Sequence, residues 1–277
     1  MSILYISYDG ILEPLGQSQV LAYQEKLAKD FDITLMSFEK PADLNNHQLL
    51  HSMQERISKT SIKWIARRYH KAPSIFATSY DLLAGFVHCS YLVWRYKIKV
   101  VHARSYPPAL IALFLKKFFG IKFLFDMRGF WADERVDGNI WNKDSQIYRV
   151  TKSLEESFIV NSDHIISLTN AAVNEIEQFP YLASASLPIS VISTCVDLEK
   201  FTPKNKNIES ENFILGYLGT VGTWYLFQET IQAFKILLEI RPLAKILIIN
   251  KGEHKFIQES LVNQGISLDL VEIRSAK

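Results

Sequence analysis

Short apolar runs alternate with longer amphipathic stretches from the first residues of the chain. Residues 3–7 form an Ile/Leu/Tyr-rich run, and residues 18–29 then place Val20 and Leu27 on one side of a helix. The predicted strands are 3–7, 33–38, 62–66, 100–102, 121–125, 164–168 and 189–192, and the predicted helices are 18–29, 46–59, 79–96, 108–119, 146–161 and 171–178. This alternation predicts an α/β fold built on a doubly wound parallel sheet.

A polar, turn-rich stretch at residues 201–212 separates this region from a shorter α/β pattern. The second pattern has predicted strands at 213–218, 244–249 and 268–273 and predicted helices at 224–239 and 254–264. Two βα units are too few to complete a sheet of ordinary width. We therefore expect an N-terminal Rossmann-like domain at residues 1–200 and an incomplete second Rossmann-like domain at residues 213–277.

The charges are unevenly distributed along the chain. Residues 1–125 hold 16 lysines and arginines against 9 acidic residues, whereas the remainder holds 15 against 20. A basic first half suits an anionic membrane or a phosphorylated substrate, and an ordinary solvated surface explains it equally well. The aromatic and basic stretches 91–97 and 113–119 resemble membrane-interface segments, but helices that cover a sheet look similar, and packing is the favoured interpretation.

The start of the chain and its cysteines bear on the compartment. Met1 is followed almost at once by a predicted strand, no apolar run is long enough to cross a bilayer, and the two cysteines suggest neither a disulfide framework nor a zinc site. We expect a cytoplasmic protein, with contact at the inner face of the cytoplasmic membrane as an open alternative. The isoelectric point near 8.3, without a recognisable module, argues against a nucleic-acid partner.

Residues 123–134 concentrate charges and aromatic rings at the end of a predicted buried strand. Asp126 and Arg128 follow this strand, and Asp133 and Glu134 come shortly afterwards. Ligands of open α/β sheets bind outside the carboxyl ends of the strands, so this position suits a polar-ligand site. The alternative is an Asp126–Arg128 ion pair beside a packed aromatic core.

Three other turns carry candidate ligand contacts. His102 and Arg104 come at another strand end, where a cation would serve a phosphate or a carboxylate. Gly16 and Gln17 lie just before a predicted helix, where backbone amides can hold an anion. In the second domain, the turn that contains Gly219, Thr220 and Thr223 repeats this arrangement and suits a pyrophosphate. Each place has an alternative interpretation: a satisfied core histidine at His102, an ordinary loop at Gly16 and Gln17, and a tight capped turn at Gly219, Thr220 and Thr223.

Motifs of other chemistries do not occur in the sequence. It has no Ser/His/Asp set in a recognisable order, no CxxC pair, no HExxH and no acidic metal cluster, and its first loop is neither a GxGxxG nor a P-loop. The sequence therefore gives no reason to expect a metal, a bound cofactor or a protein nucleophile.

The order of these pieces resembles glycosyltransferase family 4, the retaining enzymes of GT-B fold. The most specific match is residues 191–203, Val-Ile-Ser-Thr-Cys-Val-Asp-Leu-Glu-Lys-Phe-Thr-Pro, which look like the interdomain segment I-P-N-G-V-D-x-x-x-F-x-P. The turn 217–225 occupies the place of the donor-phosphate loop G-R-L-x-x-x-K-G. Asp126 falls where the family carries a His or Asp beside the transferred sugar.

The chain also departs from the family pattern. Thr194 and Cys195 replace Asn-Gly in the interdomain segment, and the phosphate loop lacks its Arg and Lys, with Thr220 in the place of the arginine. The E-x7-E donor motif of the family would lie further along than Lys277. The resemblance therefore implies a donor-binding domain that is truncated in this sequence.

The resemblance implies a specific reaction and specific roles. The expected activity is metal-independent, retaining transfer of a sugar from a UDP- or GDP-sugar, without a cofactor, to a cell-envelope or capsular glycan, often lipid-linked. Asp126 would orient the sugar or acceptor hydroxyl, with Arg128 assisting. Substrate contacts would come from Gly16, Gln17, His102, Arg104, Asp133 and Glu134, and the diphosphate would bind at Gly219, Thr220 and Thr223. Two alternatives remain: an inactive fragment, or a non-catalytic binding or assembly module of an envelope-polysaccharide system.

Overall fold

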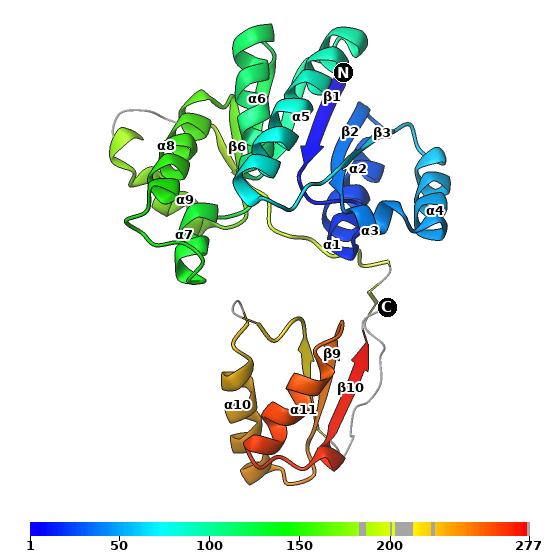
Figure 1. The fold of residues 1–277 in the computed structure, drawn as a ribbon, viewed down its shortest axis with the longest axis vertical. Coiled ribbons are helices and arrows are strands. Elements are labelled where there is room, and N and C mark those ends of the chain that lie inside the picture. The colour runs from blue at the N-terminus through cyan, green and yellow to red at the C-terminus, as the bar shows by residue number, and fades with distance from the viewer. Residues whose placement is uncertain (183–186, 200, 203–212, 223–224, 276–277) are drawn as a thin grey trace. The chain divides into compact units, whose positions relative to one another are not determined.

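The computed structural model describes residues 1–182, 187–199, 201–202, 213–222 and 225–275. Contacts within the chain divide it into two compact units, Met1–Val196 and Asp197–Lys277 (Figure 1). Each unit contains its own parallel sheet and its own hydrophobic core.

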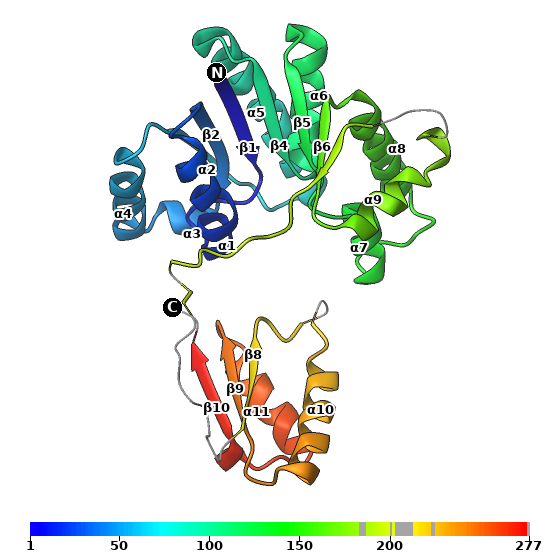
Figure 2. The same cartoon turned by 180° about the vertical axis from the view of Figure 1, so that it is seen from behind.

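The first unit is built on seven parallel strands in the order β3-β2-β1-β4-β5-β6-β7 (Figures 1 and 2). The strands are β1 Ser2–Ser7, β2 Asp32–Glu39, β3 Lys63–Arg68, β4 Val100–Arg104, β5 Lys122–Asp126, β6 His164–Ser167 and β7 Ile189–Val191. The chain builds the sheet in one direction from β1 to β3 and in the other from β4 onward. The order therefore reverses between β1 and β4, which creates a crevice at their carboxyl ends.

Helices connect these strands, and local sequence sets several of their ends. They are α1 Pro14–Gly16, the π-helical turn η1 Gln17–Leu21, α2 Ala22–Leu27, α3 Pro41–Leu44, α4 His47–Ser58, α5 Ser74–Tyr96, α6 Tyr106–Phe119, α7 Trp131–Asp137, α8 Gln146–Asn161, α9 Asn170–Glu177 and the 3-10 turn η2 Pro180–Leu182. The side chains of Asn46, Ser145 and Thr169 cap α4, α8 and α9 by accepting backbone N–H bonds. Gly120 ends α6 in the left-handed conformation, with φ of 64°.

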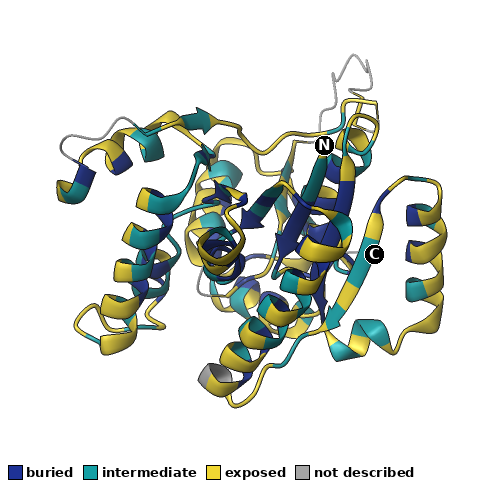
Figure 3. Ribbon diagram, turned by 90° about the horizontal axis from the view of Figure 1, so that it is seen from above, coloured by how far each residue is buried: buried dark blue, intermediate teal, exposed yellow. Residues whose placement is uncertain are grey.

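Apolar side chains cover the first sheet on both faces. Leu4 and Ile6 of β1 belong to a core cluster with α5 and α6, whereas Tyr5 belongs to a second cluster with Val20 of η1 and Met53 of α4. Alternate residues of one strand therefore pack against helices on opposite faces. In Figure 3, buried residues concentrate in the strands and exposed residues on the outer sides of the helices. The predicted doubly wound α/β fold is confirmed.

The second unit has three parallel strands in the order β10-β9-β8. Its elements are β8 Ile214–Leu218, α10 Phe227–Ile240, β9 Lys245–Asn250, α11 His254–Asn263, the 3-10 turn η3 Leu268–Leu270 and β10 Val271–Ser275. Ile231 and Phe234 of α10 pack with Ile246 and Ile248 of β9 in its core. Helix α10 begins three residues later than the sequence predicts, because the backbone still turns at Tyr225, whose N–H donates to the Gly222 carbonyl.

Three sequence-based expectations need correction in the first unit. Helix α5 begins at Ser74 instead of residue 79, and the short helix α7 was not predicted, because a seven-residue segment is too short for periodicity to reveal. The packing interpretation of stretches 91–97 and 113–119 is wrong for part of each. Leu92 and Leu115 are buried, but Tyr91, Trp94 and Phe118 lie on the surface, because each helix is apolar on its outer side as well.

Candidate functional site

The topological reversal of the sheet brings Asp9 and Arg104 together. Asp9 follows β1 and Arg104 ends β4, and their Oδ2 and Nε atoms lie 3.4 Å apart. Arg104 is 5% exposed, whereas the side chain of Asp9 is largely open to solvent. This contact therefore spans the point where ligands bind in open α/β sheets.

Asp126 ends the next strand, β5, and its carboxylate lies among three nitrogen-bearing side chains. Its carboxylate is 3.8 Å from the guanidinium of Arg104, 3.8 Å from that of Arg128 and 3.6 Å from His102 Nε2. The expected Asp126–Arg128 ion pair is therefore present, but Arg128 shares the carboxylate with Arg104. The structure brings these four predicted site residues together.

Two buried polar atoms of this cluster make no hydrogen bond within the part of the chain that the structure describes. They are Asp126 Oδ1 and His102 Nε2. Buried polar atoms in proteins are nearly always hydrogen-bonded, and exceptions call for an explanation such as a water or a ligand. An acceptor at Asp126 beside two guanidinium groups suits a ligand that carries a hydroxyl next to an anionic group.

Gln19 holds the two arginines together, and the sequence analysis did not identify it. Its Oε1 accepts from the Nη2 atoms of both Arg104 and Arg128, at 3.0 and 3.1 Å. Arg128 Nη2 also lies 3.2 Å from Oγ1 of Thr194, in the segment that resembles the interdomain motif. Gln19 lies in the π-helical turn η1, and such turns occur frequently at functional sites. The sequence analysis singled out Gln17, two residues earlier, as a candidate instead.

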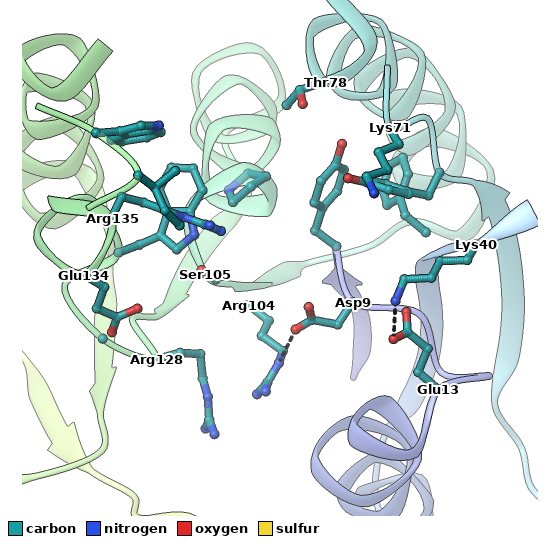
Figure 4. Close-up of a pocket in the computed structure, with 18 residues that line it drawn as sticks. Asp9, Glu13, Lys40, Lys71, Thr78, Arg104, Ser105, Arg128, Glu134 and Arg135 are labelled. Atoms are coloured by element: carbon teal, nitrogen blue, oxygen red, sulfur yellow. Dashed lines mark hydrogen bonds and ion pairs between the residues drawn. The ribbon is translucent and has the colours of Figure 1, made fainter. Parts of the chain in front are cut away.

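A cavity of about 720 Å³ opens above this cluster (Figure 4). Its lining includes two pairs of aromatic rings: Tyr8 and Tyr69, whose centroids lie 5.5 Å apart, and Trp131 and Trp141, whose centroids lie 5.2 Å apart. Its charged lining residues are Asp9, Glu13, Lys40, Lys71, Arg104, Arg128, Glu134 and Arg135. The volume falls in the range of small-molecule sites, and the mixture of rings and charges suits a polar ligand with flat faces.

Helix α7 brings only one residue of the predicted acidic pair to the main cavity, although both line a second hollow. Glu134 lines this cavity, and burial raises the pKa of its carboxyl group despite the opposing charge of Arg135. Asp133 lines a separate hollow, where it accepts hydrogen bonds from the Tyr148 hydroxyl at 2.7 Å and from Lys152 Nζ at 2.9 Å. The structure therefore does not bring Asp133 to the arginine cluster.

A buried polar network supports Trp131, one of the aromatic rings that line the cavity. The Tyr106 hydroxyl donates to Glu155, which is 1% exposed, and Lys152 also donates to that carboxylate. Burial, and then the neighbouring carboxylate, raise the pKa of Tyr106, so it remains a donor. The ring of Tyr106 lies 5.7 Å from that of Trp131 between centroids, so the network holds α6, α7 and α8 in a fixed relation.

The first loop is anchored from below by a buried carboxylate. Glu39 accepts from the N–H groups of Ile11 and Leu12 at 2.9 and 3.0 Å and from the Ser37 hydroxyl. Burial raises the pKa of Glu39, against these hydrogen bonds. This anchor fixes the backbone that leads from Asp9 into α1.

At Gly16, where we expected backbone amides to hold an anion, the structure shows close contact with the loop itself. A Cβ atom on Gly16 would lie 1.9 Å from the carbonyl oxygen of Gly10. Gln17 Nε2 donates to the Leu12 carbonyl at 3.2 Å, and neither Gly16 nor Gln17 lines the cavity. Contact of these two residues with a substrate stays a prediction.

The glycine turn of the second unit has internal partners for part of its backbone. Gly219 has φ of 145°, which favours glycine, and the N–H of Val221 donates to the carboxylate of Glu253 at 3.1 Å. Thr220 is exposed, and Tyr217 donates to its carbonyl. Thr223 lies outside the described residues. Phosphate binding at this turn stays a prediction, and Glu253 places a negative charge beside it.

The comparisons with known proteins bear on the fold. No protein-family model and no curated protein sequence matches the chain. Sucrose-phosphate synthase from Thermosynechococcus elongatus matches with a TM-score of 0.70 at 12% identity, over 100% of this chain and 70% of that one. Anabaena HepE in complex with UDP and glucose matches with a TM-score of 0.66 at 13% identity, over 100% and 70%. This chain has a GT-B type fold.

A third structure with this fold is the lipopolysaccharide outer core galactosyltransferase WaaB in its apo form. It matches with a TM-score of 0.59 at 12% identity, over 100% of this chain and 68% of that one. The TM-scores establish the shared GT-B fold, but the identities are too low to carry the function over, which has to be argued from this chain's own residues. Among the residues that the structure describes, no group of three or more His, Cys, Asp or Glu side chains is placed to hold a metal ion.

Proposed function

We propose that this chain is a glycosyltransferase of the family 4 type, which moves a sugar from a UDP- or GDP-sugar to an acceptor bound in the cavity of the first unit. The observation that carries the proposal is the Asp126 carboxylate, which has a buried oxygen without a hydrogen bond among the described residues and lies beside Arg104 and Arg128 at the carboxyl ends of β4 and β5. Fold neighbours whose structures contain UDP or UDP-glucose support a nucleotide-sugar as the donor.

The proposed roles follow from the arginine cluster and the cavity beside it. Arg104 and Arg128 line the cavity, whereas Asp126 contacts both arginines without lining the cavity itself. Transfer breaks the bond between the anomeric carbon and the phosphate oxygen and forms a bond to an acceptor hydroxyl, whose proton goes to the departing diphosphate. Asp126 orients the reacting hydroxyl, and Arg128 stabilises the negative charge that develops. Such a reaction, retaining and without metal or cofactor, needs no protein nucleophile. Gly219, Thr220 and Thr223 would supply the diphosphate contacts.

The acceptor that we propose is a cell-envelope or capsular glycan carried on a lipid. The rings of Tyr8, Tyr69, Trp131 and Trp141 suit the flat faces of sugars, and the cations at the base of the cavity suit a phosphate or a carboxylate of a glycan. The basic first half of the chain agrees with an anionic acceptor.

One observation favours a second function, that of a non-catalytic binding or assembly module. In the second unit, Glu253 occupies the N–H of Val221 and receives a hydrogen bond from Asn250 at 2.9 Å. A carboxylate there opposes the binding of a diphosphate, and the turn contains no Arg or Lys to offset it. In this alternative, the cavity of the first unit binds a glycan without transferring a sugar to it.

Titration calorimetry with a panel of UDP- and GDP-sugars separates the two functions. The glycosyltransferase proposal expects one of them to bind, and Glu253→Gln to bind it more tightly because a negative charge is removed. Glu259→Gln, which changes an acidic residue on the outer part of α11, is the matched control and should leave the affinity unchanged. If none of the sugars binds, the non-catalytic function is favoured. Where transfer is detected, NMR of the product's anomeric configuration tests retention.

A further inference from the structure

The outer side of α5 is apolar along its whole length. Six large side chains recur at intervals of three or four residues, which places them on one face of the helix. They form what we call the apolar stripe: Phe76, Tyr80, Leu83, Val87, Tyr91 and Trp94. Their exposed fractions range from 54% for Tyr91 to 78% for Phe76. Packing of the first unit therefore leaves this face of the helix uncovered.

This pattern departs from that of an ordinary surface helix. A helix that covers a sheet normally carries polar or charged residues on its outer side. Between Phe76 and Trp94 the sequence has a single Asp, Glu, Lys or Arg, Asp81, and that residue is 1% exposed because it turns inward to hydrogen-bond with His70. Large exposed apolar patches on soluble proteins usually mark interaction surfaces.

Helix α6 extends the patch, because it packs directly against α5 (Figures 1 and 2). The ring centroid of Phe86 lies 5.9 Å from that of Phe114 and 5.8 Å from that of Phe118. Phe114 is 42% exposed and Phe118 is 71% exposed. The two helices therefore present one continuous apolar surface, and the stripe from Phe76 to Trp94 is about 27 Å long by the helical rise.

The charges around this surface are mostly positive. Residues 61–122 contain eleven lysines and arginines, and Asp81 is the one acidic residue among them. Arg95, Lys97 and Lys117 are exposed at the carboxyl ends of the two helices, and Lys71 is exposed before the start of α5. Asp163 is the acidic neighbour at that end, and Lys116 and Lys122 pair with it. The rim of the surface therefore complements an anionic partner.

We propose that the apolar stripe and the exposed rings of α6 dock onto the anionic surface of a lipid bilayer. Trp94, Tyr91 and Phe118 combine apolar bodies with positions beside cations, which is the composition of segments that lie at the level of lipid headgroups. Lys and Arg near such a surface add attraction to anionic lipids. No helix in the described part of the chain is long and apolar enough to cross a membrane, so this contact is peripheral.

The charge pattern favours lipid over a second copy of this chain. A twofold contact through this face would bring the positively charged rims of both copies together, and like charges across an interface oppose association. The surface also begins beside the proposed acceptor cavity, because Thr78 of α5 lines that cavity. Docking would bring the cavity to the membrane, where a lipid-linked acceptor resides, but the docking itself requires no sugar transfer.

Vesicle flotation tests the proposal with the full chain and without a sugar donor. We expect the protein to float with vesicles of 30% phosphatidylglycerol in phosphatidylcholine at low salt, and to float much less with pure phosphatidylcholine or in about 0.5 M salt, where charges are screened. The double variant Trp94→Ser/Phe118→Ser should reduce the bound fraction at least tenfold. Lys97→Glu/Lys117→Glu should abolish the preference for phosphatidylglycerol.

The matched control changes exposed apolar side chains elsewhere. Ile240→Ser/Phe256→Ser removes two exposed apolar side chains of the second unit and should float as the wild type does. Circular dichroism and thermal midpoints show that each variant is folded. The proposal fails if folded wild-type protein does not float with either vesicle, or if the Trp94→Ser/Phe118→Ser variant floats as well as the wild type. It fails equally if sedimentation shows a dimer that this variant abolishes, because a second copy then covers the face.

Discussion

The backbones of Arg104 and Asp126 are direct register partners at the carboxyl ends of β4 and β5. The parallel pairing of these strands places a guanidinium and a carboxylate side by side, 3.8 Å apart and both largely buried. Arg104 also reaches Asp9 across the reversal point of the sheet. The centre of the candidate site therefore rests on strand ends, which are more rigid than loops.

Replacement of Asp126 tests the proposed chemistry. We expect Asp126→Asn to lower sugar transfer or donor hydrolysis by about a hundredfold or more, because an amide orients a hydroxyl less strongly and removes the charge between Arg104 and Arg128. Steady-state rates at saturating donor measure the effect. Asp30→Asn, at an exposed position of the same unit, should retain wild-type rates. Wild-type turnover in Asp126→Asn would remove Asp126 from the mechanism.

The tight first loop predicts a stability effect at Gly16. Gly16→Ala should lower the free energy of unfolding by about 2 kcal/mol, because the new methyl group overlaps the Gly10 carbonyl and the loop has to move. Ser18→Ala, two residues further along at an exposed position, should change it by less than about 0.5 kcal/mol. Urea denaturation compares the two variants. Equal stabilities would show that the loop accommodates a side chain freely.

The buried network predicts a cost at Tyr106. Tyr106→Phe removes the hydroxyl that donates to the buried Glu155 and should destabilise the first unit by about 2 kcal/mol. Tyr148→Phe is the matched control, because its partner Asp133 is partly exposed and water can replace the lost bond. Its loss should stay below about 1 kcal/mol. Chemical denaturation followed by fluorescence measures both, and a larger loss in Tyr148→Phe would contradict the assignment.

Asp163 predicts a change of stability with pH. Burial alone would raise the pKa of Asp163, but hydrogen bonds from Lys116, the Phe123 N–H and Lys122 outweigh it and lower the pKa from 3.8 to about 2. A carboxyl group with a lowered folded-state pKa stabilises the protein above its unfolded pKa, and the stabilisation is lost as the pH falls from near 3.8 through 2.

Urea midpoints measured between pH 5 and pH 2 test this linkage. Asp163→Asn should be less stable than the wild type at pH 5, and the difference should shrink as the pH falls through that window. Asp30→Asn should keep the pH dependence of the wild type. A difference for Asp163→Asn that is independent of pH would mean that Asp163 acts through packing alone.

Strand order explains why the sequence predicted part of the site. Asp126 and Arg104 each end an apolar run, and parallel strands place such ends on one edge whatever the details of the connections. The prediction failed where side-chain direction mattered. Asp133 and Glu134 are adjacent in the sequence, but successive helical residues point about 100° apart, so Glu134 reaches the main cavity whereas Asp133 lines only the second hollow.

The contact of Gln19 with the arginines and the exposure of the apolar stripe could not be predicted from the sequence, for other reasons. The π-helical turn adds a residue to the helical period, so η1 aims Gln19 at the arginines where a regular pattern gives no signal. Helix α5 is apolar on both its inner and its outer side, so periodicity does not show which side meets the sheet. Only the packed structure distinguishes Leu92, which is buried, from Trp94, which is exposed.

The two prolines at the start of α6 have a consequence for selectivity. Pro107 and Pro108 carry no N–H, and the N–H of Ala109 already donates to the Ser105 carbonyl. An ordinary helix start attracts any small oxyanion through its free amides, but this one offers the cavity little beyond the N–H of Tyr106. Anion binding then falls to the forked guanidinium groups of Arg104 and Arg128, which contact a free phosphate as readily as one that belongs to a larger molecule. A preference for the larger molecule therefore has to come from the aromatic rings that line the cavity with them.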